Sequence, residues 1–504
     1  MSGLSTYCRL FGAGCNLIRA DALLPREISG QLPGSVRLFA RFLRLFAGPQ
    51  ARRGRPGERL ATAFERLGPA AIKLGQLVST RADIFGLQFA EDLSRLKDRL
   101  EPFSTKEAEA EVERALGCSL SEVFAEFEGP VAAASLAQAH RARLIDGRAV
   151  AVKVLRPGIE RRVAADADVL LLAARLVEAL APPARRLEPR AFAATVVRML
   201  QLELDLRFEA AGADELGAIM TADGFMHAPK VIWSGVARRV LTLEWAAGMP
   251  LSENAALEQP GLDRRGLANN LTRGFLAQAL DHGAFHADLH EGNLFVQPSA
   301  RVTAVDFGIV GRLGPAERRY LAEILWGFLR RDYRRVAAVH FEAGYVPGDQ
   351  DQAAFAQALR AVGEPLFGRT ARDVSMGRLL AQLFEITALF EMRLRPELVL
   401  LQKTMVTVEG VARRIDPGHD IWAAAEPVVR RWITRELSPA ARVTSLAADA
   451  RSALAVIARR EEAVESQPPA PVDQHHAAQS SALVMFMLGA LTATLVIAVS
   501  ILVR

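Results

Sequence analysis

The sequence predicts an α+β protein with two lobes, and three observations lead to this fold class. First, a helical opening gives way to two strand-like segments, 131–144 and 149–155, which are joined by an Asp-Gly turn typical of a β-hairpin. Second, apolar residues after about residue 250 recur mostly at helical spacing. Third, two short strands, 294–296 and 302–305, interrupt this helical half. A small sheet-rich lobe and a larger helical lobe follow from this order.

The remaining segments complete the predicted organisation. Helices are expected from 159 to 219 with a break at Pro182-Pro183, and strand-like segments at 231–233 and 240–245. The predicted units are an N-terminal segment with an amphipathic helix (1–56), a helical extension (57–125), the smaller lobe (126–250), the helical lobe (251–460), a Pro-rich linker (461–481) and a transmembrane helix (482–503).

The composition limits the classes of protein that fit. The 504 residues are 50% hydrophobic, which allows a large core and more than one structural unit. The net charge is only +5 and no dense basic run is interleaved with aromatic residues, so nucleic acid is not an expected partner. The three cysteines form no C-x-x-C pair, which suits a reducing compartment without disulfides. The basic residues include only six lysines: Lys73, Lys97, Lys106, Lys153, Lys230 and Lys403.

The most informative stretch is His286-Ala-Asp288-Leu-His-Glu-Gly-Asn293, which is followed by Asp306-Phe-Gly thirteen residues after the Asn. Phosphoryl transfer needs a carboxylate near the attacking group and two oxygen ligands for Mg²⁺. This stretch supplies all three at the spacing found in kinases. It therefore predicts Mg²⁺-nucleotide chemistry.

Two other interpretations use the same residues. His286, Asp288 and His290 are residue types that bind transition metals. However, Gly292-Asn293 so soon after His290 is typical of a loop and not of a zinc-binding helix. The remaining alternative is a turn whose polar groups are satisfied within a core.

A second segment, Ala149-Val-Ala-Val-Lys153, has the V-A-x-K form of a strand whose lysine binds the nucleotide phosphates. Such a lysine needs a glutamate on the following helix, and Glu209 is favoured over Glu203 as its partner. Asp205 and Glu209 are expected on one helical face, an arrangement of like charges that suggests a cation nearby. The alternatives are a surface lysine on an edge strand and a solvated acidic face.

The segment expected to cover the phosphates departs from a glycine-rich loop. Alanine restricts the positive φ angles that glycine allows, so this loop should approach a nucleotide differently. Its residues are Val131, Ala132, Ala133, Ala134, Ser135, Leu136, Ala137, Gln138 and Ala139.

Upstream of this loop, Lys73 and Gln76 lie on one face of an otherwise apolar predicted helix. A lysine on a buried face needs a counter-charge, which Glu203 or Asp205 would supply. The alternative is a lysine whose side chain extends to solvent.

Both ends of the chain contain apolar segments. Residues 482–503 form an uncharged run long enough to cross a bilayer as a helix, which predicts a tail anchor. Near the N-terminus, Leu38, Phe42 and Leu45 fall on one helical face, opposite Arg37 and Arg41. This helix is expected either at a membrane interface or packed on the core of the protein itself.

Taken together, these motifs resemble the UbiB family of atypical kinase-like proteins, which serves ubiquinone (coenzyme Q) biosynthesis. The resemblance runs from about residue 57 to residue 433 and includes Leu398-Val-Leu-Leu-Gln-Lys403-Thr. It departs from the family pattern at Glu291, where the family usually has proline, and at the tail, where one apolar span replaces two.

The resemblance implies a role for each motif. The loop 131–139, Lys153 and Glu244 would bind ATP, and Asn293 and Asp306 would bind Mg²⁺. The catalytic residues would be Asp288, Lys153 and Glu209. Lys73, Gln76, Glu203 and Asp205 would be family-specific, with the first two on a helix over the place where a protein kinase binds its peptide.

The expected function is that of a Mg²⁺-dependent ATP-binding protein and ATPase that supports ubiquinone biosynthesis by aiding the handling of lipid precursors or organising the biosynthetic enzymes. The alternatives are a kinase that acts on a protein or a small molecule in that pathway, and a non-catalytic ATP-gated scaffold. Membrane lipid, polyprenyl quinone precursors and other ubiquinone-synthesis enzymes are the expected partners. The expected location is the bacterial inner membrane, with a tail anchor and a cytoplasmic catalytic body.

Overall fold

The protein is described from a computed structural model. It describes residues 3–22, 26–27, 34–48, 51, 54–79, 87–94, 96, 101–180, 188–364, 386, 389–392 and 396–437. The described helices are α1 (Gly3–Arg19), α2 (Gly34–Leu43), α3 (Pro56–Leu67), α4 (Pro69–Ser79), α6 (Leu87–Ser94), α7 (Thr105–Leu116), α8 (Ile159–Leu180), α9 (Pro189–Glu203), α10 (Leu206–Asp223), α11 (Arg264–Ala277), α12 (Pro315–Arg330), α13 (Tyr333–Glu342), α14 (Gln352–Gly363), α16 (Pro396–Ile415) and α17 (Ile421–Glu436). The described strands are β1 (Phe124–Ala133), β2 (Ala137–Leu144), β3 (Ala149–Leu155), β4 (Met226–His227), β5 (Val240–Glu244), β6 (Met249–Pro250), β7 (Ala284–His286), β8 (Leu294–Gln297), β9 (Ser299–Ala304) and β10 (Val310–Arg312).

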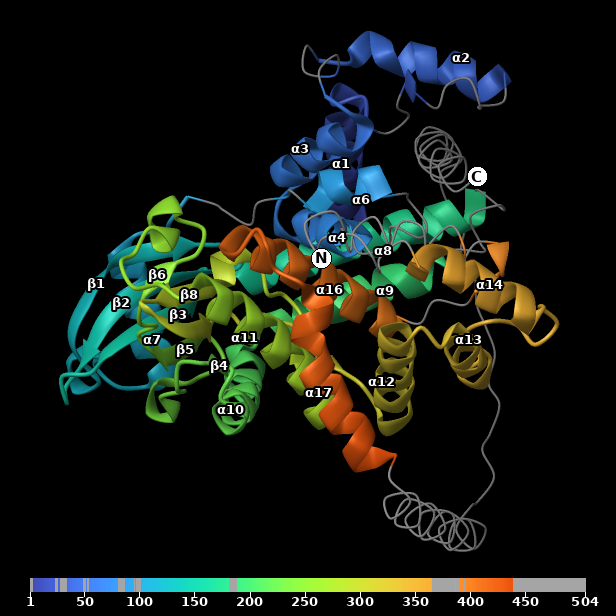
Figure 1. Cartoon of the computed structure of the whole chain (residues 1–504). Helices are drawn as coiled ribbons and strands as arrows, with labels where there is room; N and C mark the ends of the chain where they lie inside the picture. The colour runs from blue at the N-terminus through green and yellow to red at the C-terminus, as the bar shows by residue number, and fades with distance from the viewer. Residues whose placement is uncertain are drawn as a thin grey trace, which may run out of the picture.

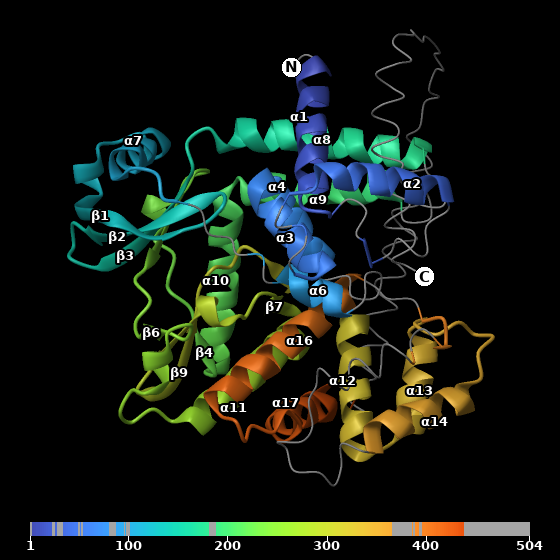
Figure 2. The same ribbon diagram turned by 90° about the horizontal axis from the view of Figure 1, so that it is seen from above.

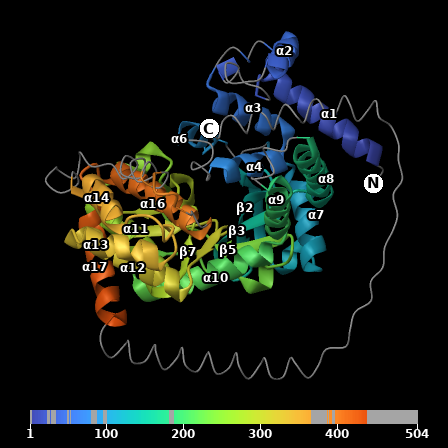
Figure 3. The same ribbon diagram turned by 90° about the vertical axis from the view of Figure 1, so that its right-hand side faces the viewer.

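The smaller lobe contains a four-stranded sheet in the order β1-β2-β3-β5, with its neighbouring strands antiparallel. Val150, Val152 and Val154 of β3 are fully buried in a core shared with Val112 of α7. Because side chains alternate along a strand, Lys153 points to the other face of the sheet. In Figure 3 the strands β2, β3 and β5 of this sheet lie beside the helical lobe, whose helices α12, α13, α14 and α17 are on the left.

The prediction of one strand over 131–144 is wrong. This segment forms the end of β1, a tight turn and β2, with Ala132 paired to Ala139 and the backbone N–H of Ala134 donating to Ala137 O at 2.8 Å. Alanine and leucine carry no turn signal, which is why the break was not predicted. The predicted strand 231–233 is also wrong, because this segment makes only an isolated bridge to β5 and then a short 3-10 turn.

The helix expected through Asp205 is interrupted at that residue. Asp205 has extended backbone angles (φ −127°, ψ 94°), and its carboxylate accepts a hydrogen bond from the N–H of Arg207 as the N-cap of α10. Asp205 and Glu209 therefore do not form the predicted like-charge pair four residues apart within one helix. The helix α10 then runs from the small sheet toward the helical lobe (Figure 2).

The helical lobe is built around α11, which packs against α16 and α17 (Figure 1). Phe275 of α11 and Phe285 of β7 are buried in its core, with ring centroids 5.8 Å apart in an edge-to-face arrangement. Two small sheets, β4-β9-β8-β6 and β10-β7, lie against this core and hold the predicted polar motif. The predicted strands at 294–296 and 302–305 are found as β8 and β9, with small differences at their ends.

The N-terminal helices form a separate apolar cluster. Phe64 of α3, Val78 of α4 and Leu93 of α6 are buried in it. Gly75 of α4 lies so close to Phe64 and Leu96 that a Cβ atom would overlap both side chains. On α2 and the short 3-10 turn that follows it, by contrast, Leu38, Phe42, Leu45 and Phe46 are all exposed.

The prediction of a tail-anchored inner-membrane protein with a cytoplasmic body is corrected. Within the described ranges, no helix has both the length and the apolar character needed to cross a membrane. The apolar run 482–503, on which that prediction depended, lies outside the described residues.

One buried histidine makes the stability of the helical lobe depend on pH. His340 of α13 packs against the ring of Phe355 at a centroid distance of 5.3 Å, and its Nδ1 donates to Val336 O at 2.8 Å. Burial lowers the pKa of His340 to about 4. The ring is neutral in the folded protein at neutral pH. Its contribution to stability is therefore complete above the pKa of about 6.5 that the histidine has in the unfolded chain. This contribution is lost as the pH falls from about 6.5 toward the pKa of His340 in the folded protein.

We predict that the free energy of unfolding falls with acid partly through this residue. Between pH 7.5 and pH 5 the loss due to His340 should be about 2 kcal/mol. The comparison is chemical denaturation of wild type and His340→Phe at both pH values, with the exposed His290→Phe as the matched control. The acid-dependent loss should be smaller in His340→Phe than in the other two proteins. Equal losses in all three would contradict the assignment.

Candidate active site

The catalytic loop predicted from the sequence connects β7 to β8, and its histidine holds it in shape. His286 is fully buried. Its Nδ1 accepts the N–H of Asp288 at 3.1 Å, and its Nε2 donates to Val305 O at 3.1 Å. Burial lowers the pKa of His286, so the neutral ring that these two bonds require is favoured. His286 therefore ties the loop to the chain immediately before Asp306.

Asp288 is fixed by its backbone, while its carboxylate is left accessible. Its carbonyl accepts the Asn293 side-chain N–H at 3.1 Å. Its carboxylate oxygens lie 3.8 Å from Lys403 Nζ and 3.7 Å from His290 Nε2. These distances are beyond hydrogen-bonding range, so the carboxylate is flanked by nitrogen groups without being tightly bound to either.

The transition-metal interpretation does not fit this geometry. Both ring nitrogens of His286 are occupied by protein groups, and Nδ1 of His290 accepts the N–H of Gly292 at 3.0 Å. In the part of the chain that the structure describes, no three His, Cys, Asp or Glu side chains are grouped so that they could hold a metal ion. The interpretation of the loop as a simple core turn also fits poorly, because the side chain of Asp288 is one-third exposed.

The pairing of β8 with β9 brings Asn293 next to Asp306. The N–H of Val305 donates to Asn293 O at 2.9 Å, directly before Asp306 in the chain. The side-chain nitrogen of Asn293 donates to the backbone carbonyl of Asp288. The side-chain oxygen of Asn293, Oδ1, is therefore the group left to bind a metal. An amide oxygen and a carboxylate are the donor types that Mg²⁺ prefers, so the two predicted ligands fit this ion. Asp306 has a left-handed backbone (φ 61°), which is uncommon outside glycine and occurs at functional sites.

Lys153 joins three segments of the chain. Its Nζ donates to both carboxylate oxygens of Glu209, at 2.7 and 2.9 Å, and to Asp306 Oδ1 at 3.2 Å. Glu209 is the partner favoured from the sequence. Its helix also lies close to the Asp-Phe-Gly segment, since a Cβ atom on Gly212 would stand 3.2 Å from Phe307 O.

The charged groups in this cluster shift one another's pKa values. Burial raises the pKa of Glu209 to about 7, although Lys153 opposes the rise. The Lys153 ammonium holds the pKa of Asp306 well below its usual range, with a smaller contribution from Lys73. Burial disfavours the charged form of Lys153, but the carboxylates of Asp306 and Glu209 outweigh it and raise the pKa of this lysine. The site therefore holds a charged lysine at neutral pH.

The alanine-rich loop is a tight hairpin whose backbone is bonded to Arg156. Its tip residue Ser135 is fully buried. The Arg156 side chain donates to Ala134 O at 2.9 Å, and the Arg156 backbone N–H donates to Leu136 O at 2.8 Å. This arginine was not predicted as a site residue, since nothing in its sequence context marks it apart from its place after β3.

Two predicted nucleotide-binding residues have side chains with other visible partners. The Gln138 amide exchanges hydrogen bonds with the backbone N–H and C=O of Phe103, at 3.0 and 3.1 Å, and contacts His140. Glu244 lies at the end of β5, and its carboxylate accepts the backbone N–H of Lys230 at 3.4 Å. Their roles toward a nucleotide remain predictions.

Lys73 of α4 pairs with Glu203 at 2.9 Å, which is one of the two counter-charges expected from the sequence. The other, Asp205, pairs with Arg207. Gln76 is half-buried one turn after Lys73 on α4. The structure thus brings Lys73 and Glu203 together and directs Asp205 elsewhere.

The helix α16 contributes residues that were not predicted to belong to the site. Lys403 faces Asp288, Thr404 Oγ1 donates to Ala287 O at 3.1 Å, and Arg414 pairs with Glu291. The scarcity of lysine was a signal that could have singled out Lys403, because Lys153 and Lys73 of the same small set were assigned to the site.

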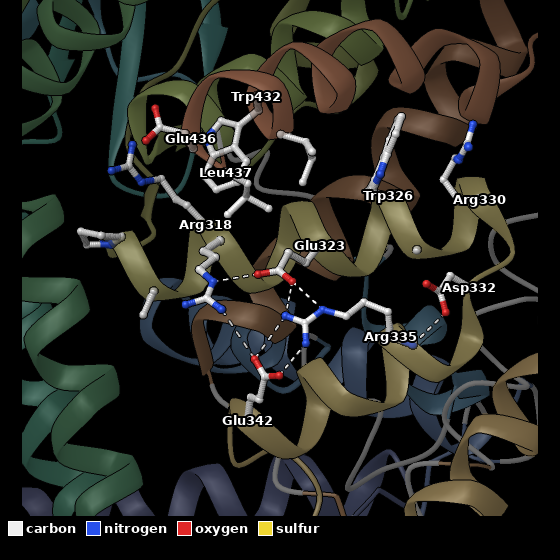
Figure 4. A pocket seen from close by; sticks show the side chains of 15 residues that line it. Arg318, Glu323, Trp326, Arg330, Asp332, Arg335, Glu342, Trp432, Glu436 and Leu437 are labelled. Carbon is white, nitrogen blue, oxygen red and sulfur yellow. Dashed lines mark hydrogen bonds and ion pairs between the residues drawn. The ribbon is translucent and has the colours of Figure 1, made fainter. Parts of the chain in front are cut away.

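A cavity of about 1170 Å³ lies among α12, α13 and α17, and none of the predicted site residues lines it (Figure 4). Its buried Glu323 accepts hydrogen bonds from Arg319 and Arg335, and Arg335 also pairs with Glu342. This cavity therefore lies apart from the cluster formed by Lys153, Glu209 and Asp306.

The two lobes, the lysine paired with a helical glutamate and the loop between β7 and the Asp-Phe-Gly segment define a kinase-like protein. Residues 95–340 match the ABC1 atypical kinase-like domain, and residues 359–420 match the UbiB helical domain. A protein of Marinobacter nauticus named "Probable protein kinase UbiB" is 39% identical over 451 residues, which cover 88% of this chain and 82% of that protein. This chain belongs to the UbiB family of atypical kinase-like proteins.

Two further comparisons concern a second relative and the fold. A protein of Xanthomonas oryzae with the same name is 42% identical over 395 residues, covering 76% of this chain and 71% of that one. The structure of the Rv3197–erythromycin complex from Mycobacterium tuberculosis is similar with a TM-score of 0.50 at 22% identity, over 78% of this chain and 98% of that one. This last likeness concerns the fold alone.

We predict that Glu209→Gln weakens ATP binding by about tenfold to a hundredfold, because a neutral amide holds the Lys153 ammonium less firmly than a carboxylate. Calorimetric titration with ATP and Mg²⁺ measures the effect. Glu215→Gln is the matched control, since Glu215 lies on the same helix and pairs with Arg312 at the surface. Equal affinities for the two variants would argue against the role of Glu209.

Proposed function

We propose that this protein binds ATP with Mg²⁺ and hydrolyses it in support of ubiquinone biosynthesis. The observation that carries the proposal is the convergence of Lys153, Glu209 and Asp306, with Asn293 beside Asp306 and Asp288 bonded to Asn293 through its backbone. The pathway is inferred from the family and from the name of its relatives. Handling of polyprenyl quinone precursors and contact with other enzymes of that pathway belong to the same proposal.

In the proposed mechanism each residue has a separate task. Lys153, held by Glu209, would bind the α- and β-phosphates, and Asn293 and Asp306 would hold Mg²⁺, which neutralises phosphate charge when bound. Asp288 would accept the proton of the attacking water molecule. The backbone bonds of Asp288 to His286 and Asn293 keep its carboxylate in place without occupying it.

Hydrolysis is favoured over transfer to a protein because of α4. Lys73 of this helix pairs with Glu203 and is close enough to lower the pKa of Asp306. A helix near the phosphate-binding residues would hinder a large acceptor more than it would hinder water. The second candidate function is phosphoryl transfer to a protein or a small molecule, which is favoured by the printed name of the relatives.

We predict that Asp306→Asn removes most of the gain in ATP affinity that Mg²⁺ provides, by at least about tenfold, because the neutral amide is a weaker ligand. Titration of a fluorescent ATP analogue with Mg²⁺ or with EDTA measures this gain, and the exposed Asp349→Asn is the control. Cells that lack their own copy should also regain ubiquinone with wild type and not with Asp306→Asn. Full recovery of ubiquinone with this variant would refute the proposal.

We predict that Asp288→Asn lowers kcat for ATP by about 10²- to 10⁴-fold and leaves ATP affinity within about twofold, since it removes a general base and no phosphate ligand. Turnover of γ-labelled ATP by the full-length protein measures both the rate and the destination of the label. Label in inorganic phosphate supports hydrolysis, and label on a protein or phenol supports transfer. Normal ubiquinone output with Asp288→Asn, combined with its loss in Asp306→Asn, would indicate a scaffold gated by ATP.

A further inference from the structure

The helix α16 contacts the catalytic loop at three successive places. Thr404 bonds to Ala287, Lys403 faces Asp288, and Arg414 pairs with Glu291. The loop is therefore supported along its length by a helix more than a hundred residues later in the chain. Such support fixes side chains more precisely than a free loop does.

Thr404 sets the position of its neighbour Lys403. Thr404 is only 1% exposed. Its Oγ1 bonds both to Leu400 O on its own helix and to Ala287 O on the catalytic loop. Because Ala287 directly precedes Asp288, this buried contact fixes the distance between the backbones that carry Lys403 and Asp288.

The geometry of Lys403 is poorly explained by fold stability. Lys403 Nζ and Asp288 Oδ1 are 3.8 Å apart, and each side chain is 33% exposed. Exposed ion pairs of this kind contribute at most about 1 kcal/mol to folding. The second oxygen of the same carboxylate faces His290 Nε2 at 3.7 Å. The carboxylate is thus bracketed from two sides.

We propose that Lys403 is a positioning residue for Asp288. This inference rests on the proposed function, and it adds a residue of α16 to the working site. Lys403 and His290 flank the two carboxylate oxygens of Asp288 at 3.8 and 3.7 Å, and the attraction of the Lys403 charge favours one orientation of this carboxylate. Asp288 takes the proton of the attacking water or hydroxyl group. At the same time the oxygen of that water or hydroxyl group forms a bond to the γ-phosphorus. The bond from that phosphorus to the bridging oxygen breaks, and ADP leaves with the electron pair.

The test compares the full-length proteins carrying Lys403→Met, which keeps the length and removes the charge, and Lys403→Arg, which keeps the charge. The expected result for Lys403→Met is a fall in kcat of about 10- to 100-fold with KM for ATP and melting temperature nearly unchanged. Lys403→Arg should recover at least half of this loss on a logarithmic scale. Lys106→Met, an exposed lysine on α7, is the matched control and should behave as wild type.

A second comparison separates positioning from a general effect of the charge. If Lys403 acts through Asp288, Lys403→Met should change kcat less than about twofold in the Asp288→Asn background, because residues that act as a unit are not additive. An equal loss in both backgrounds would overturn the proposal. A kcat of Lys403→Met within about twofold of wild type would also overturn it. So would a fall in kcat that is accompanied by a lower melting temperature and is not recovered in Lys403→Arg.

The outcome for wild type distinguishes the two proposals. ATP turnover by wild type with an unchanged rate in Lys403→Met would overturn the role of Lys403 and leave the proposed function standing. Absence of any turnover or transfer by wild type would overturn both.

Discussion

The contact of Lys153 with Glu209 and Asp306 is the interaction on which the site depends. It connects β3 of the small lobe, the helix α10 and the chain that follows β9. One ammonium group is shared by two carboxylates, and the Asp306 side chain is still 50% exposed. The Asp306 carboxylate is therefore held in place while part of its surface stays accessible.

The second constraint is the set of bonds that holds the catalytic loop. His286 connects Asp288 to the carbonyl of Val305, and Gln278 Oε1 accepts the backbone N–H of His286 at 3.0 Å. Gln278 begins a five-residue π-helical turn, Gln278–His282, that ends α11. Wider turns of this kind are frequent at functional sites. The loop is thus positioned by the core of the helical lobe through backbone groups, while its carboxylate stays available for chemistry.

Much of the site could be predicted because its residues carry chemistry at short spacing. The Lys153–Glu209 pair follows from a lysine on a strand and a glutamate on a helix, and Asn293 meets Asp306 because two short strands pair across a tight connection. The contribution of α16 could not be predicted from spacing, because Lys403 is separated from Asp288 by a long stretch of sequence. Such contacts are determined by helix packing, which no local pattern describes.

Local errors also had local causes. The turn at Ala134 within the predicted strand 131–144 was missed because alanine and leucine carry no turn signal. The helix break at Asp205 was missed because a single side-chain cap outweighs helical periodicity.

The close approach of Gly212 to Phe307 has a wider consequence. Even one methyl group there would press α10 away from the Asp-Phe-Gly backbone by a few tenths of an ångström, and Glu209 would move with it. The spacing between Glu209, which binds Lys153, and Asp306 is therefore set by the absence of a side chain at Gly212, one turn along the helix.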